Sequence, residues 1–171
     1  MQPLSALLID TNIWLDYFIP QRQGHKKACH LIEEACRQDV AILYAVTSLK
    51  DVFYLVAVSL KRAVRQRGGD ISEGDARAIQ AASWGIVEAM GELGTPIAAD
   101  ATDFWLARKY RALHADLEDN FVLAAARRAH VDVLVTGDEK LIKHAPVCAM
   151  TAEDACAYLE MGAGADVSTT K

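Results

Sequence analysis

Short compact apolar runs recur along the chain and are separated by longer segments of mixed polarity. Runs of this kind, a few residues long and bounded by polar positions, are typical of strands buried on both faces of a parallel sheet. The predicted strands are residues 4–9, 40–46, 95–98, 131–135 and 147–150.

The segments between these runs carry apolar residues at the 3.6-residue spacing of amphipathic helices. Ser48 is expected to cap one long helix, and Ser72 followed by Asp75 is a capping signal for another that runs to about residue 93. The other predicted helices cover residues 13–18, 26–37, 101–112, 118–130 and 153–160, and residues 141–142 lie in a short helix.

Strands therefore alternate with helices from one end of the chain to the other. This order predicts an α/β fold, a three-layer α/β/α sandwich with a mainly parallel central sheet of about five strands. No internal repeat or linker divides the sequence. We expect a single domain over residues 1–161 and a flexible C-terminal tail over 162–171, where the residues are mostly small and polar.

Composition narrows the possible classes of protein. Of the 171 residues, 52% are hydrophobic, which is enough for a sizeable core. The longest apolar run, Val52 to Val58, is too short to cross a membrane, and the N-terminal stretch has no signal-like region, so we expect a cytoplasmic protein.

The net charge of −5 argues against a general nucleic-acid coat protein, although a local basic patch beside an acidic cleft remains compatible with it. The four cysteines form no CxxC pair, and zinc is not suggested.

Acidic residues fall repeatedly where predicted strands end or the following helices begin. Asp10 closes the first strand, Asp51 lies on the first turn after the second, and Asp138 follows the fourth. Asp116 and Asp119 lie at the start of the helix over 118–130. Because the carboxyl ends of parallel strands meet at one edge of the sheet, these carboxylates are expected to converge there. Clustered carboxylates with water form an all-oxygen site that suits Mg²⁺ or Mn²⁺.

Each acid also has a simpler interpretation when it is taken singly. Asp10 and Asp138 stand where an N-cap is expected, and Asp116 and Asp119 are favoured in a first helical turn by the helix dipole. Asp51 alone fits a solvated helix face. The metal interpretation therefore depends on the recurrence of acids at one sheet edge.

Two segments in this order resemble the PIN domain, a nuclease fold found in VapC-type toxins of bacterial toxin–antitoxin pairs. The first is LLIDTNIWLDYF and the second is DLEDNFVLAAARRAHVDVLVTGDEKL, with an acid-bearing strand–helix unit between them. The likeness covers roughly residues 5 to 150. It implies the same sandwich fold, dependence on Mg²⁺ or Mn²⁺, and cleavage of single-stranded RNA.

Carried over residue by residue, the resemblance implies a set of site residues. Asp10, Asp119 and Asp138 match the metal-ligating acids, and Asn12 and Thr136 match polar positions that support the metal or its water. Asp116 is similar to an extra acid of a subgroup with an Asp-x-x-Asp pattern. Asp51 stands where the family usually has a Glu, and because its side chain is one methylene shorter, a water-mediated contact with the metal is an alternative to direct coordination.

The leading hypothesis is a metal-dependent endoribonuclease that acts as the toxin of a type II toxin–antitoxin pair. The main alternative is a PIN-like module with a weakened site that binds RNA or protein. A phosphatase-type domain is a more distant third, since the DTN triplet lacks a second Asp. Lys50, Lys61, Arg62 and Arg65 are the candidate RNA contacts. The helices over 49–60 and 75–93 offer a surface for a homodimer or for an antitoxin, and the sequence does not separate these uses.

Overall fold

The computed structural model describes residues 4–166, and its centre is a five-stranded sheet in which every strand pair is parallel. The strand order across the sheet is β3-β2-β1-β4-β5. The strands are β1 (Ala6–Ile9), β2 (Ala41–Ala45), β3 (Thr95–Ile97), β4 (Val133–Val135) and β5 (Ala149–Met150). The predicted number of strands and their parallel arrangement are confirmed.

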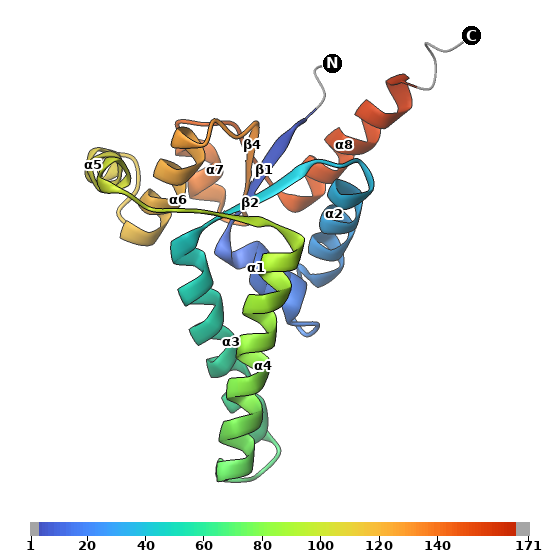
Figure 1. The fold of residues 1–171 in the computed structure, drawn as a ribbon, viewed down its shortest axis with the longest axis vertical. Helices are drawn as coiled ribbons and strands as arrows, with labels where there is room; N and C mark the ends of the chain where they lie inside the picture. The colour runs from blue at the N-terminus through green and yellow to red at the C-terminus, as the bar shows by residue number, and fades with distance from the viewer. Residues whose placement is uncertain (1–3, 167–171) are drawn as a thin grey trace.

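Helices lie on both faces of this sheet (Figure 1). They are α1 (Thr11–Phe18), α2 (His25–Arg37), α3 (Val46–Gln66), α4 (Glu73–Leu93), α5 (Ala101–Tyr110), α6 (Leu117–Arg128), α7 (Glu139–His144) and α8 (Ala152–Asp166). Side chains alternate between the faces of β1, so Leu7 and Ile9 join a core with α1, α2, α3, α4 and α8, whereas Leu8 joins a second core with α5, α6 and α7. The three-layer α/β/α sandwich is therefore confirmed.

The starts of the two longest helices differ in how well the sequence predicts them. Ser72 and Asp75 form a reciprocal capping box at the start of α4, as expected. Ser48 is not a cap, because α3 already begins at Val46 and has no side-chain cap. The Ser48 side chain is instead buried, and its hydroxyl accepts a hydrogen bond from the Thr11 hydroxyl at 3.0 Å. Ser48 therefore joins α3 to α1.

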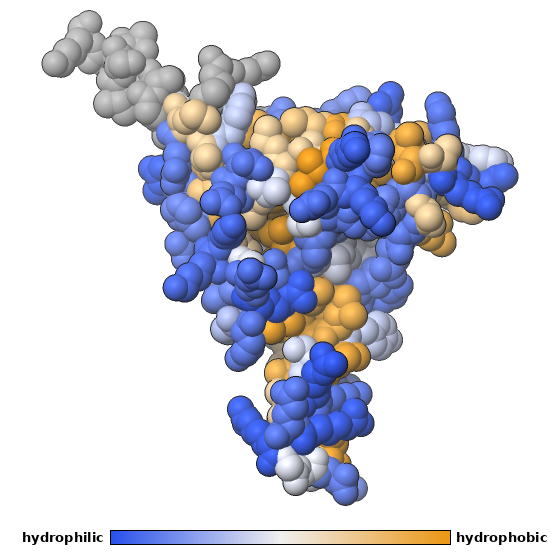
Figure 2. Space-filling view, turned by 180° about the vertical axis from the view of Figure 1, so that it is seen from behind, coloured by the Kyte–Doolittle hydropathy of each residue, from blue (hydrophilic) through white to orange (hydrophobic). Residues whose placement is uncertain are grey.

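Helices α3 and α4 form a hairpin that protrudes from the body of the domain (Figure 1), and we call it the arm. The rings of Phe53 and Trp84 pack between its helices with centroids 5.2 Å apart. Five large apolar side chains on the arm are exposed: Val46, Tyr54, Leu55, Val58 and Trp84. Figure 2 shows hydrophobic surface along the arm and where it joins the body. The arm thus has an apolar face as well as charged ones.

The last helix, α8, is longer than predicted. It continues past the expected end at residue 160 as far as Asp166, so the first part of the predicted tail is helical. Residues 167–171, the rest of that tail, lie outside the described residues. Among the helices that the structure describes, none has both the length and the apolar character needed to cross a bilayer.

A buried ion pair joins α5 to α6. The Arg128 guanidinium donates from Nε to Asp103 Oδ1 and from Nη2 to Asp103 Oδ2, both at 3.0 Å. The Asp103 side chain is 2% exposed. Because a buried carboxylate is costly without its partner, this pair holds the two helices in one register.

We predict that Arg128→Met destabilises the protein by about 3 kcal/mol, because it leaves the Asp103 carboxylate buried and unpaired. Urea unfolding measures the change. Arg127→Met, at the neighbouring position on α6, is the matched control and should have little effect. Equal stability of the two variants would show that the pair is not needed.

Candidate active site

Three acids at the carboxyl edge of the sheet are N-caps of the helices that follow. Asp10 caps α1, Asp116 caps α6 and Asp138 caps α7. Asp10 Oδ1 accepts one hydrogen bond from a first-turn backbone N–H, at 2.7 Å, whereas Oδ1 of Asp138 and of Asp116 each accepts two, the shorter at 2.7 Å and 2.8 Å. The capping interpretation of Asp10 and Asp138 is thus correct, and Asp116, expected within the first turn of the helix, is the N-cap instead. Because each cap uses only Oδ1, it leaves Oδ2 for other roles.

The Asp10 carboxylate is the most deeply buried acid of the group, with 3% of the residue exposed. Its Oδ2 accepts hydrogen bonds from Asn12 Nδ2 at 2.6 Å and from Thr136 Oγ1 at 2.7 Å. Burial raises the pKa of Asp10, and the hydrogen bonds from Thr136, Thr11 and Asn12 act in the opposite direction. Asp10 is therefore a buried acid whose charged form is solvated by the protein.

Asn12 and Thr136, predicted to support the site, connect the ends of two neighbouring strands. β1 pairs with β4, and the Asp10 N–H donates to the Val135 carbonyl at 3.0 Å. Asn12 Oδ1 accepts from the Gly137 N–H at 2.8 Å, and Thr136 Oγ1 accepts from the Asp138 N–H at 3.1 Å. The segment after β1 and the segment after β4 are thus held in one hydrogen-bond network.

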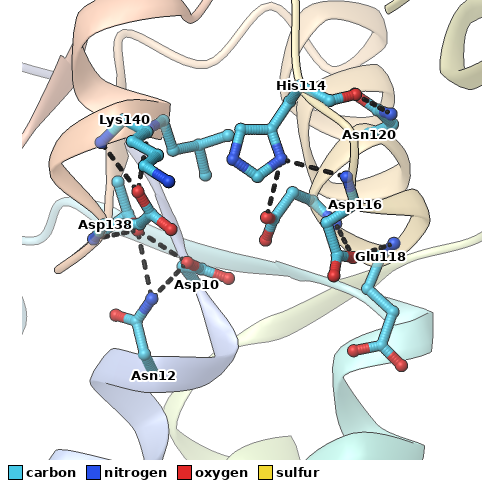
Figure 3. Close-up of polar contacts among 11 residues, drawn as sticks. Asp10, Asn12, His114, Asp116, Glu118, Asn120, Asp138 and Lys140 are labelled. Atoms are coloured by element: carbon cyan, nitrogen blue, oxygen red, sulfur yellow. Dashed lines mark hydrogen bonds and ion pairs between the residues drawn. The ribbon is translucent and has the colours of Figure 1, made fainter. Parts of the chain in front are cut away.

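Asp119 lies opposite this network, on the first turn of α6, in a group with Asp138 and His114. One donor atom from each of the three residues lies within 4.8 Å of the others. Burial, followed by the charge of Asp10, raises the pKa of Asp119 to about 6. Asp119 therefore completes a crowded set of carboxylates at this edge. Figure 3 shows Asp10, Asp138 and His114 around one space.

His114 has no motif around it, and the sequence assigns it no role. It reaches the site because the segment between α5 and α6 folds over the start of α6. Asn120 Nδ2 donates to the His114 carbonyl at 3.0 Å, and the His114 Nδ1 lies 3.0 Å from Asp119 Oδ2. Only its position shortly before the Asp-x-x-Asp pattern signals this placement in the sequence.

Asp51 does not belong to the Asp119–Asp138–His114 group. Its Oδ1 pairs with Lys50 Nζ at 3.1 Å, and its neighbour across the interface with α6 is Glu118. Burial and the Asp51 charge raise the pKa of Glu118, a residue that sequence reasoning did not select. In Figure 3 Glu118 extends away from Asp10 and Asp138. Asp51 and Glu118 form a second acidic pair beside the first group.

The basic residues predicted to contact RNA fall into two places. Lys50 lies at the base of α3 and is paired with Asp51. Lys61, Arg62 and Arg65 are exposed on the arm. At a rise of about 1.5 Å per residue, they lie roughly 15–20 Å along α3 from Asp51. The structure thus does not bring these three cations to the acids.

Comparison with known proteins decides the family. The sequence matches the family model of the PIN domain over residues 6–140, a range that starts at β1 and ends two residues after Asp138. The chain belongs to the PIN domain family. No curated protein matches it. Among solved structures it is similar to VapBC2 from Rickettsia felis, bound to a DNA fragment from their promoter, with 12% identity and a TM-score of 0.61 over 85% of this chain and 98% of the other.

The donor atoms of this PIN domain fit a hard divalent cation. Asp119 and Asp138 offer carboxylate oxygens in the group with His114, and Asp10 lies close enough for its charge to raise the pKa of Asp119. Asp10 and Asp138 each keep Oδ1 on a backbone cap. Raised pKa values at Asp10 and Asp119 show that like charges and burial oppose ionisation in the metal-free protein. A cation placed among these oxygens would offset that repulsion, and oxygen donors suit Mg²⁺ or Mn²⁺.

The pKa of Asp119 predicts how the stability of the metal-free PIN domain varies with pH. Because this acid binds its proton more tightly when folded, its ionisation destabilises the native state as pH rises from about 4 to about 6. Asp119→Asn removes that effect. With EDTA present, we expect the variant to gain thermal stability relative to the wild type across this interval and to keep the gain at pH 7.

Thermal melts at a series of pH values measure this difference. Added Mn²⁺ should then raise the melting temperature of the wild type, because a ligand that binds only the native state stabilises it, and should raise that of the variant less. If Asp119→Asn is less stable than the wild type at pH 7, repulsion among the carboxylates does not destabilise the native state, and the prediction is wrong.

Proposed function

We propose that this PIN domain is a metal-dependent endoribonuclease that cleaves single-stranded RNA. The observation that supports the proposal is the crowding of carboxylates around Asp119: Asp138 lies in one group with it, and the charges of Asp10 and Asp138 both raise its pKa. Asp10, Asp119 and Asp138 follow β1, begin α6 and follow β4, and all three fall inside the family match. A site of this composition supports phosphodiester chemistry, because each acid offers a hard oxygen ligand and the clustered carboxylates are negatively charged without a cation.

In this proposal Asp10, Asp119 and Asp138 hold Mg²⁺ or Mn²⁺. A bound divalent ion would lower the pKa of a coordinated water molecule and stabilise negative charge on the phosphate. The chain itself fixes the ligands. Asn12 and Thr136 hold Asp10 Oδ2 in place, and the caps on α1 and α7 orient the carboxylates of Asp10 and Asp138. Asp116 acts mainly as the cap that positions Asp119 on the first turn of α6.

Asp51 has a secondary place in this mechanism. Its carboxylate is engaged by Lys50, and its position beside Glu118 puts two acids where the family usually has one Glu. We propose that this pair assists beside the metal site, with Lys50 exposed for an RNA phosphate. The ion pair with Lys50 also favours the alternative function, RNA or protein binding without cleavage, because it partly neutralises the Asp51 carboxylate.

We further propose that the protein acts in the cytoplasm as the toxin of a type II pair and binds an antitoxin. The similar Rickettsia felis structure is a VapBC2 assembly, and in this chain several of the exposed large apolar side chains lie on the arm. Leu15, Ile19, Leu55 and Val58 line a hollow between α1 and the arm, and Arg22 and Arg62 border it. An apolar segment with acidic residues fits such a surface.

The decisive test of the nuclease is cleavage of single-stranded RNA with Mn²⁺ or Mg²⁺, stopped by EDTA. Asp10→Asn is expected to reduce cleavage by about 100-fold or more, since even residues behind the ligands are worth about 10–100-fold. Asp132→Asn is the matched control, because this acid accepts hydrogen bonds from Ser5 and Ala6 at the start of β1, at the opposite edge of the sheet.

Both variants lose one negative charge, so a general charge effect would appear in both. Full activity in Asp10→Asn would exclude the metal-dependent nuclease. Binding of RNA by the wild type without cleavage under any metal condition would favour the binding module.

The antitoxin surface predicts a separate result. Val58→Asp places a charge in the apolar hollow of the arm and should abolish co-purification with the product of an adjacent open reading frame, while RNA cleavage persists. Met161→Asp, an exposed apolar position on α8, is the control and should leave co-purification intact. Loss of the complex in both variants, or in neither, would place the partner elsewhere.

A further inference from the structure

His114 faces the candidate active site without being one of its acids. Its side chain is 14% exposed, and its Nδ1 has two neighbours. Asp119 Oδ2 lies at 3.0 Å and the Asp116 backbone N at 3.3 Å. The ring also lines a hollow together with Leu113, Lys140 and His144. The imidazole is therefore fixed between the segment before α6 and the first turn of that helix.

One ring nitrogen cannot serve both neighbours at once. If Nδ1 carries no proton, it accepts from the Asp116 N–H and faces the Asp119 carboxylate with a lone pair, which is repulsive. If Nδ1 carries the proton, it donates to Asp119 Oδ2, and this is the shorter contact. Hydrogen bonds to an ionised carboxylate are also the stronger kind. With Asp119 ionised, the Nδ1–H tautomer is thus favoured.

Asp119 depends on this donor more than the other acids depend on theirs. Asp10 and Asp138 each have an oxygen held by the backbone N–H groups of the helix they cap. Asp119 lies inside the first turn, where its own N–H donates to Asp116 Oδ1. Among the described residues, His114 is the one whose side chain pairs with the Asp119 carboxylate.

We infer that His114 is a positioning residue, which donates Nδ1–H to Asp119 Oδ2 and so turns the other oxygen of that carboxylate toward the divalent cation. The inference rests on the proposed function, because it assigns a role at the same metal site. Partners of this kind orient a ligand and raise metal affinity by about 10–100-fold. The role belongs to one ring nitrogen, and this makes it testable by substitution.

Asparagine and glutamine provide the matched pair. The Asn side-chain nitrogen occupies the place of the imidazole Nδ1, one bond beyond Cγ, whereas the Gln nitrogen lies closer to Nε2. We expect His114→Ala to weaken Mn²⁺ binding by about 10–100-fold and His114→Gln to resemble it. His114→Asn should bind Mn²⁺ nearly as the wild type does. The free-Mn²⁺ electron paramagnetic resonance signal during a titration measures all four proteins without reference to catalysis.

His144→Ala is the control, because this histidine lines the same hollow and makes none of the contacts with the site acids that the structure gives His114. It should leave Mn²⁺ affinity unchanged. Thermal melts check folding. The hydrogen bond from Asn120 to residue 114 uses the backbone carbonyl, so it persists in every variant.

The outcomes separate this inference from the proposed function. If the wild type binds no Mn²⁺, the metal-dependent nuclease fails. If the wild type binds Mn²⁺ and His114→Ala binds it equally well, the positioning role alone fails. Weak binding by His114→Asn, or nitrogen coupling to bound Mn²⁺ that disappears in His114→Ala, would show a direct ligand and overturn the positioning role.

Discussion

The Asp10 carboxylate, buried at the junction of β1 and β4, is the interaction on which the rest of the site depends. A charge in this place is costly unless hydrogen-bond donors replace water. Here the donors come from both strand ends, because Thr11 and Asn12 follow β1 and Thr136 follows β4. Solvating Asp10 therefore requires that the two segments lie together. The same requirement brings Asp138 to the site, since its N–H donates to Thr136.

Helix N-termini explain how the metal-free protein tolerates several acids at one edge. Asp10, Asp116 and Asp138 each stand at the positive end of a helix dipole and accept backbone hydrogen bonds there. Asp119 receives no cap of its own, and burial and the neighbouring charges raise its pKa to about 6. Of these four acids, Asp119 is the one whose carboxylate caps no helix. That carboxylate is the one that His114 contacts and that a cation would relieve most.

The parts of this picture that the sequence predicts are the local ones. The five strands follow from compact apolar runs, and Asp10 and Asp138 are marked by their place directly after a strand. Contacts between distant segments leave no such mark. Ser48 looks like a cap and is instead buried against Thr11, because α3 packs on α1. His114 and Glu118 enter the site only through the packing of α6, and the cations of the arm are clustered in sequence yet extended along α3 in space.

Helix α3 connects the two halves of the proposed function. Asp51 lies near its start, in the acidic pair with Glu118, and Val58 lies two turns further along, on the apolar surface of the arm. At about 1.5 Å per residue, these positions are roughly 10 Å apart along the helix axis. A peptide that covers the hollow beside Val58 therefore needs only a few more residues to reach the acidic pair of Asp51 and Glu118. If the protein is a toxin nuclease, as proposed, helix α3 thus places the antitoxin-binding surface close to the active site that an antitoxin has to block.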